Sequence, residues 1–232
     1  MPRPRQAARF RAGPHPRVAA LGALAACAEC QQPETVCVCK ELAPLAHRIA
    51  ILILQHPQEQ DRLLATARLT ARAFADSVLK IGLSWRSLAQ ALGRPAEPRR
   101  WAVLYLGSDK ADALAKDREL VLLDGKGKLL PDQPAALAGI QGIVLLDGSW
   151  SQAKALWWRN PWMLKCRRLV LGPKSASRFG KLRREPRHDA LSTLEAAALA
   201  VARLEGRPEI EAALGTSFQT MLDRYEAALK AQ

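Results

Sequence analysis

The chain has 232 residues, of which 49% are apolar and 25% are charged, and this ordinary globular composition excludes wholesale disorder, collagen-like repeats and coiled coils. Apolar runs such as Ile49 to Leu54 are far shorter than the roughly 18 residues of a membrane-spanning helix, so we expect no integral membrane protein. The 35 Lys and Arg against 22 Asp and Glu give a net charge of +13, which favours an acidic partner such as nucleic acid.

The positive charge is concentrated in two segments. Residues 1–17 contain five arginines and no acid, and residues 159–187 contain ten basic residues against Glu185 alone. The rest of the chain carries a net charge of −1. A solvated face is the plain interpretation of such a run, but charge gathered in one stretch also supplies the local field that phosphate binding requires. We therefore expect nucleic-acid contact from the segment 159–187.

The arginine-rich start, followed by the apolar stretch 18–26 and a cysteine, imitates an export signal. Its high alanine content, Gly22 and the four prolines before it disfavour export, and a cytoplasmic protein is expected. The chain is expected to divide into a basic flexible tail (1–26), a zinc-binding element (27–45) and an α/β body (46–232).

Four of the five cysteines lie within 13 residues, in the spacing C-x2-C-x6-C-x-C. Two cysteine pairs separated by a turn can supply the four soft ligands of a tetrahedral Zn²⁺ site, whereas two disulfides are the alternative. Because nothing else in the chain suggests an oxidising compartment, structural zinc is favoured. The predicted ligands are Cys27, Cys30, Cys37 and Cys39.

Beyond residue 45 the sequence alternates between apolar runs and helical patterns, which predicts an α/β fold with a mostly parallel sheet and helices on both faces. The predicted strands are 49–54, 101–106, 120–123, 143–146 and 169–171. The predicted helices are 61–74, 85–92, 152–158 and 193–204.

Ligands of open α/β sheets bind beyond the carboxyl ends of the strands. The run 143–146 is followed by Asp147 and Gly148, which could present a carboxylate and bare amides to a ligand, or could form an ordinary turn capped by Ser149. Ser192 and Glu195 have the spacing of a helix capping box, whose free amides could also receive polar groups of a cofactor. No GxGxxG or Walker sequence is present.

In this order, the four-cysteine pattern, His56-Pro57-x-Glu59, the run Leu145 to Lys154 containing Asp147-Gly148-Ser149-Trp150, and Leu182 to Pro186 with Leu191 to Ala196 resemble the DTW-domain family. The resemblance spans about residues 27–200, and it departs at Ser149, where the family more often has Thr. Members are tRNA-uridine aminocarboxypropyltransferases. The Asp-x-Ser-Trp and Leu-Ser elements also resemble the related ribosomal-RNA aminocarboxypropyltransferases, which implies a SPOUT-like C-terminal knot.

The resemblance implies transfer of the 3-amino-3-carboxypropyl group of S-adenosyl-L-methionine to N3 of a tRNA uridine, in the variable loop, with release of methylthioadenosine. Asp147 is the implied catalytic residue, either polarising or accepting the N3 proton or holding the ammonium group of the cofactor. No obligate protein partner is inferred. The implied cofactor-binding residues are Leu146, Asp147, Gly148, Trp150, Leu171, Pro173, Ser192 and Thr193. The residues expected to bind RNA are Arg178, Lys181, Arg183, Arg184 and Arg187.

Two other functions are compatible with these residues. An RNA methyltransferase on the same scaffold would use the same cofactor but expose its methyl carbon. A zinc-containing RNA-binding protein without catalysis would have no affinity for S-adenosyl-L-methionine.

Overall fold

The computed structural model describes residues 21, 24–104, 118–180, 182 and 191–231. Within these residues one six-stranded sheet has the order β2-β1-β5-β3-β6-β4. Its strands are β1 (Ala50–Gln55), β2 (Ser77–Ile81), β3 (Trp101–Leu104), β4 (Leu120–Leu123), β5 (Gly142–Asp147) and β6 (Arg167–Leu171). Its helices are α2 (Ala67–Ala73), α3 (Leu88–Leu92), α5 (Gln133–Ala138), α6 (Trp150–Arg159), α7 (Thr193–Glu205) and α8 (Pro208–Lys230), with short 3-10 helices η1 (Pro57–Glu59), η2 (Pro98–Arg100) and η3 (Pro161–Lys165).

All neighbouring strands in the sheet are parallel except β4, which runs antiparallel to β6 at one edge. This arrangement confirms the predicted mostly parallel α/β sheet. The strand β1 is buried along its whole length because it lies inside the sheet and is covered on both faces. Its continuous apolar sequence is the expected signature of such a strand.

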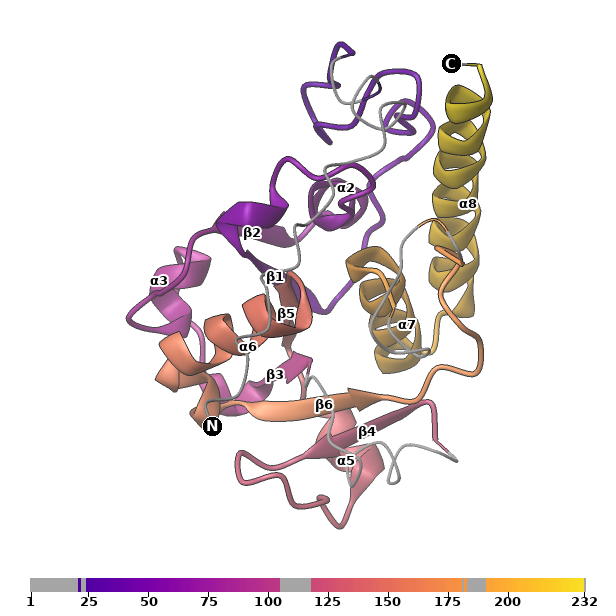
Figure 1. The fold of residues 1–232 in the computed structure, drawn as a ribbon. Coiled ribbons are helices and arrows are strands. Elements are labelled where there is room, and N and C mark those ends of the chain that lie inside the picture. The colour runs from indigo at the N-terminus through magenta and orange to yellow at the C-terminus, as the bar shows by residue number, and fades with distance from the viewer. Residues whose placement is uncertain (1–20, 22–23, 105–117, 181, 183–190, 232) are drawn as a thin grey trace, which may run out of the picture.

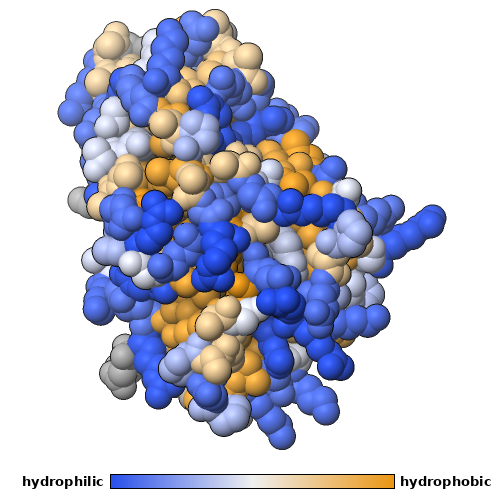
Figure 2. All heavy atoms as spheres, turned by 180° about the vertical axis from the view of Figure 1, so that it is seen from behind, coloured by the Kyte–Doolittle hydropathy of each residue, from blue (hydrophilic) through white to orange (hydrophobic). Residues whose placement is uncertain are grey.

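Helices cover both faces of the sheet, as predicted (Figure 1). Alternate residues of β1 divide between the two sides: Ile51 and Ile53 pack into a core shared with α2, α7 and α8. Leu52 and Leu54 pack into a second core shared with α3 and η3. Seen from behind, hydrophilic side chains cover most of the surface, and apolar side chains gather in patches between them (Figure 2).

Several element boundaries differ from the sequence predictions. Of the helix expected over 61–74, only residues 67–73 form a helix, α2, because Leu64 adopts a positive φ of 60° that interrupts the helical backbone. The helix expected over 85–92 begins at Leu88, after Ser87 accepts a hydrogen bond from the amide of Gln90. The strand expected to reach residue 106 is described only to Leu104.

Three elements, β2, α5 and α8, were not predicted from the sequence. The strand β2 is an edge strand and is only partly buried, so it lacks a continuous apolar run. The helix α8 is amphipathic and buries Ile210, Leu214 and Phe218 at four-residue spacing, a signal that the sequence does contain. The expected SPOUT-like C-terminal knot stays a prediction.

Candidate active site and metal centre

Asp147 is the last residue of β5, and Gln55 is the last residue of β1 beside it. The two strands are parallel with Gln55 paired to Asp147, so both side chains leave the same edge of the sheet. The Gln55 amide Nε2 donates a hydrogen bond of 2.9 Å to Asp147 Oδ2, and both residues are buried. Because an ionised carboxylate only accepts hydrogen bonds, this contact fixes which way the Gln55 amide points. It leaves Gln55 Oε1 buried without a hydrogen-bond partner among the described residues.

The second oxygen of Asp147 is held from the opposite side by α7. The Thr193 hydroxyl donates a hydrogen bond to Asp147 Oδ1. Thr193 is the first residue of α7, so the carboxylate faces the N-terminal end of a helix, where the helix dipole favours negative charge. Both oxygens of the Asp147 carboxyl group are therefore anchored by hydrogen bonds.

The N-terminus of α7 has the predicted capping box. The amide of Glu195 donates to Ser192 Oγ at 3.2 Å, and the amide of Ser192 donates to Glu195 Oε2 at 2.9 Å. Ser192 is 5% exposed, whereas Thr193 is half-buried and engages Asp147. Of the two predicted cofactor residues at the start of α7, Ser192 therefore caps the helix, whereas Thr193 holds Asp147.

Gly148 forms a close turn between β5 and α6. A Cβ atom at this position would lie 2.9 Å from Gln152 Cβ and 3.4 Å from His56 Cβ, so the turn has no room for a side chain. Ser149 is the N-cap residue of α6, as the turn interpretation expected, and its amide donates to Gln152 Oε1 at 2.6 Å. The glycine and the cap explain this turn without a ligand, and Trp150, the first residue of α6, is 40% exposed.

The remaining predicted cofactor residues lie at or just after the ends of β5 and β6. Leu146 in β5 is partly buried, as is Leu171 at the end of β6. Pro173 lines a cavity of about 310 Å³ together with Leu194 and Arg178, but Asp147 is not among the residues that line this cavity. The structure therefore brings Asp147 and Thr193 into contact through a hydrogen bond, whereas Pro173 lies beside a cavity that Asp147 does not line.

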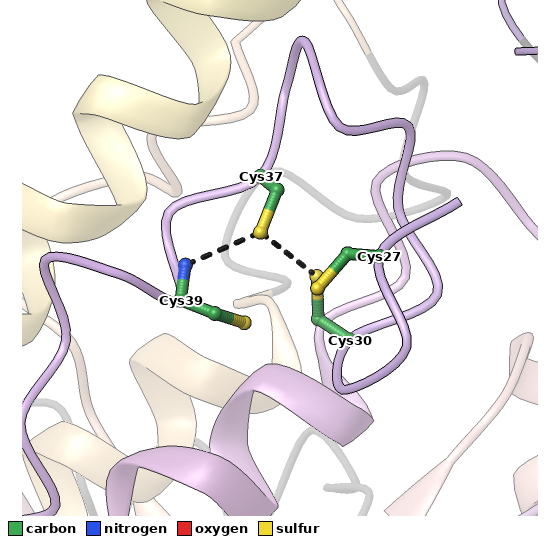
Figure 3. Close-up of side chains that lie close together, drawn as sticks. All are labelled: Cys27, Cys30, Cys37 and Cys39. Atoms are coloured by element: carbon green, nitrogen blue, oxygen red, sulfur yellow. Dashed lines mark hydrogen bonds between the residues drawn. The ribbon is translucent and has the colours of Figure 1, made fainter. Parts of the chain in front are cut away.

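The four predicted metal ligands converge. Their Sγ atoms all lie within 4.8 Å of one another, and Figure 3 shows that the cysteine pairs approach from two successive loops. Four sulfur ligands about 2.3 Å from a tetrahedral Zn²⁺ are separated by about 3.8 Å, so the thiol set fits this ion. Cys30 Sγ and Cys37 Sγ are 3.7 Å apart and every cysteine is a free thiol, which does not match the disulfide alternative.

The thiols differ in their surroundings. Burial raises the pKa of Cys30 to about 12, and it also raises the pKa of Cys39. Burial opposes ionisation of Cys27 as well, but the amides of Cys30 and Glu29 outweigh it and lower the pKa of Cys27 to about 7. A bound cation favours the thiolate form of every ligand, so metal binding would offset the cost of burying these groups.

The four-cysteine element is attached to the C-terminal helix and to the loop before α2. Arg224 of α8 donates hydrogen bonds to the Cys37 carbonyl and, at 2.7 Å, to Glu41. The Gln32 side chain accepts from the Leu64 amide at 2.7 Å and donates to the Arg62 carbonyl at 3.2 Å. Figure 1 shows this segment beside the C-terminal end of α8.

Of the predicted RNA-binding residues, only Arg178 is described. It is exposed, and its backbone amide donates to Glu195 Oε1 at 2.8 Å. The other four, Lys181, Arg183, Arg184 and Arg187, lie outside the described residues. Cys166, the fifth cysteine, is 1% exposed, and burial raises its pKa to about 12. In the described part of the chain, no helix is both long enough and apolar enough to cross a membrane.

Sequence reasoning missed Gln55 as a site residue. Its position at the end of a buried parallel strand is the signal that could have identified it, because neighbouring parallel strands end at the same edge of the sheet. The pairing of β1 with β5, which the order of elements along the chain does not reveal, was needed to connect Gln55 with Asp147.

The fold and site together define an α/β protein with an attached four-cysteine element and a buried carboxylate at the sheet edge. The DTW-domain profile matches residues 24–226. The chain belongs to the DTW-domain family.

Three curated proteins named tRNA-uridine aminocarboxypropyltransferase 2 are similar to the chain. The Drosophila melanogaster protein is 31% identical over 84% of this chain and 72% of its own length. The Macaca fascicularis protein is 28% identical over 84% of this chain and 61% of its own length. The Mus musculus protein is 30% identical over 77% of this chain and 56% of its own length. No solved structure matches the chain significantly.

Proposed function

We propose that this chain is a tRNA-modifying transferase that moves the 3-amino-3-carboxypropyl group of S-adenosyl-L-methionine to N3 of a uridine in the tRNA variable loop. The observation that carries the proposal is the similarity, across 84% of the chain, to a protein named for tRNA-uridine aminocarboxypropyl transfer. The buried carboxylate at the sheet edge supplies the chemistry that this reaction needs.

The proposed reaction is a nucleophilic substitution at carbon. The N3–H bond of uridine loses its proton, and the N3 electron pair forms a bond to the carbon of the aminocarboxypropyl group that is attached to the sulfonium. The carbon–sulfur bond breaks with its electron pair on sulfur, which leaves neutral methylthioadenosine. Because the sulfonium already activates its attached carbons, the protein has to position the correct carbon and assist the loss of the proton.

Asp147 has two possible tasks in this reaction, and both use its negative charge. It can accept the N3 proton, or it can hold the ammonium group of the transferred portion. Gln55 and Thr193 orient its two oxygens, which supports a positioned rather than a freely rotating carboxylate. Leu146, Gly148, Trp150, Leu171, Pro173, Ser192 and Thr193 are proposed to line the cofactor pocket around it.

The four cysteines are proposed to hold a structural Zn²⁺ rather than a catalytic one. A structural site has four protein ligands and no open position, and the cysteine set supplies all four. Because Arg224 connects this element with α8, the metal would stabilise the attachment of the N-terminal segment to the body. The division into a tail (1–26), a zinc element (27–45) and a body (46–232), the cytoplasmic location and the independence from a protein partner are part of the same proposal.

The basic segment 159–187, and Arg178, Lys181, Arg183, Arg184 and Arg187 in particular, are proposed to bind tRNA phosphates. Such contacts give affinity through counterion release and carry little sequence information.

Incubation of the zinc-loaded protein with tRNA and S-adenosyl-L-methionine tests the proposal, with mass spectrometry of the digested nucleosides and of the small-molecule product. The expected products are uridine carrying one aminocarboxypropyl group and methylthioadenosine. Formation of a methylated nucleoside with S-adenosylhomocysteine would identify a methyltransferase instead. No product, together with no calorimetric binding of S-adenosyl-L-methionine, would identify a non-catalytic RNA-binding protein.

A further inference from the structure

Two tryptophans of α6 are exposed to solvent. The chain has six tryptophans, and all of them are described. Trp101 and Trp162 are buried in the core beside α3, whereas Trp150 is 40% exposed and Trp158 is 74% exposed. Large exposed aromatic side chains on one element indicate an interaction surface rather than chance exposure.

The two exposed rings lie on one face of α6. Trp150, Lys154 and Trp158 follow one another at four-residue spacing, and each step turns the helix position by about 40°, so the three positions span about 80° of the helix and about 12 Å of its length. Of the buried residues of α6, Leu156 lies about 160° and Ala153 about 100° around the helix from the middle of this arc. We refer to Trp150, Lys154 and Trp158 as the α6 stripe. Figure 1 shows α6 on the side of the sheet opposite α7 and α8.

The surroundings of the α6 stripe are basic. The sequence contains no Asp or Glu from Gly148 to Arg184, a stretch with ten Lys and Arg. Lys154 lies within the stripe, and Arg159 and Lys165 are exposed in the residues that follow it. A second copy of this chain, or the arginine-rich residues 1–17, would bring further positive charge to this face. An anionic partner with flat apolar rings would complement the α6 stripe and its basic surroundings, and RNA with unpaired bases has that chemistry.

Trp157, the neighbour of Trp158 in α6, differs from it in what covers its ring. The Arg168 guanidinium lies over the Trp157 ring at 5.3 Å, so this tryptophan stacks on a cation of its own chain. The Trp158 ring, with three quarters of its surface exposed, can offer its face to a base.

We propose that the α6 stripe is a stacking platform for unpaired bases of the substrate tRNA, which rests on the proposed function. The helix α6 begins three residues after Asp147, so the stripe leads away from the proposed reaction site along the surface. Trp158 stacks a base and Lys154 contacts the phosphate beside it, while Trp150, proposed above to line the cofactor pocket, connects the stripe with that pocket. The partner is a looped or unstacked segment of RNA, because the bases of a regular helix are already stacked on one another.

Fluorescence anisotropy with labelled tRNA measures the expected effects. Trp158→Ala should weaken tRNA binding about tenfold, as expected for the loss of one stacked base, without changing the slope of log K against log salt concentration. Trp158→Phe should retain most of the affinity because phenylalanine keeps an aromatic face. Lys154→Ala should instead reduce the magnitude of the salt slope by about one. Leu129→Ala, which removes an exposed apolar side chain outside both the α6 stripe and the segment 159–187, should leave binding unchanged.

The affinity for S-adenosyl-L-methionine should be the same in Trp158→Ala and the wild type. Wild-type tRNA affinity in Trp158→Ala, with transfer activity intact, would overturn the stacking platform and leave the proposed function standing. A change in oligomeric state in Trp158→Ala, with tRNA affinity unchanged, would also overturn it by identifying a protein interface. A wild-type chain that neither binds nor modifies tRNA would contradict the proposed function itself.

Discussion

Thr193 donates a hydrogen bond to Asp147, and so connects the first residue of α7 with the last residue of β5, 46 positions earlier in the chain. Asp147 thereby has one oxygen on a hydroxyl and the other on the Gln55 amide. If this geometry orients the carboxylate for the reaction, removing the hydroxyl without changing the shape should impair the reaction.

Thr193→Val is therefore expected to lower kcat/KM for aminocarboxypropyl transfer by roughly 10- to 100-fold, which corresponds to about 1.5–3 kcal/mol for a hydrogen bond to a charged group. Thr193→Ser keeps the hydroxyl and should stay within a few-fold of the wild type. Steady-state kinetics with tRNA and S-adenosyl-L-methionine provide the measurement. Equal rates for the Val and wild-type proteins would show that the contact is only structural.

The metal centre should be occupied in the purified protein. We expect about one zinc per chain by elemental analysis, and a lower Tm after treatment with a chelator, because metal binding contributes to the free energy of unfolding. Cys30→Ser should lose the zinc, whereas Cys166→Ser, which changes a buried thiol outside the cluster, should retain it. A stable and metal-free wild-type preparation would show that the four cysteines do not form a structural zinc site.

The basic segment should contribute to tRNA affinity through its charge. Replacing Arg183 and Arg184 with Ala is expected to weaken tRNA binding and to reduce the magnitude of the salt slope by nearly two. The double variant Lys126→Ala and Lys128→Ala removes the same charge from an exposed turn outside the segment and should have little effect. Filter binding at several salt concentrations measures the tRNA affinity of both double variants and its salt dependence. If both double variants bind tRNA like the wild type, the segment is a solvated face.

A bidentate ion pair between Glu119, which precedes β4, and Arg203 of α7 predicts a pH-dependent contribution to stability. Glu119 accepts hydrogen bonds of 2.6 Å and 2.9 Å from Arg203, which lower the pKa of Glu119 to about 2. A carboxyl group with a depressed folded-state pKa stabilises the fold above its unfolded pKa of about 4.3 and loses this contribution as the pH falls towards 2.

Glu119→Gln should therefore be less stable than the wild type at pH 7, and the difference should shrink between about pH 4.5 and pH 2. Urea unfolding at a series of pH values measures the difference. Glu209→Gln breaks a more exposed ion pair with Arg207, so its loss of stability relative to the wild type should be much smaller. A pH-independent difference for Glu119→Gln would argue against the ion pair as its origin.

The sequence predicted those parts of the molecule that depend on local patterns. The apolar runs identified five of the six strands in the described chain, and the spacing of Ser192 and Glu195 predicted the start of α7. The cysteine spacing predicted a cluster that the structure assembles. Each of these signals lies within a short segment and reflects burial, capping or ligand convergence.

The features that could not be predicted depend on contacts between distant segments. Gln55 joins the site only because β1 pairs with β5, and Arg224 reaches Cys37 only because α8 folds back onto the N-terminal segment. The antiparallel direction of β4 also depends on its neighbour β6, since a short apolar run has the same sequence signature in either direction.

Nucleoside mass spectrometry of tRNA treated with the wild-type protein or with Asp147→Asn tests whether Asp147 serves the proposed aminocarboxypropyl transfer. The Asn variant keeps the size of the side chain and removes its charge. We expect aminocarboxypropyl-uridine and methylthioadenosine with the wild type, and a rate about 10²- to 10⁴-fold lower with the variant if the carboxylate accepts the proton. If it holds the ammonium group, calorimetry should show weaker S-adenosyl-L-methionine binding together with the lower rate. A folded Asp147→Asn protein with wild-type rate and cofactor affinity would contradict both roles of Asp147.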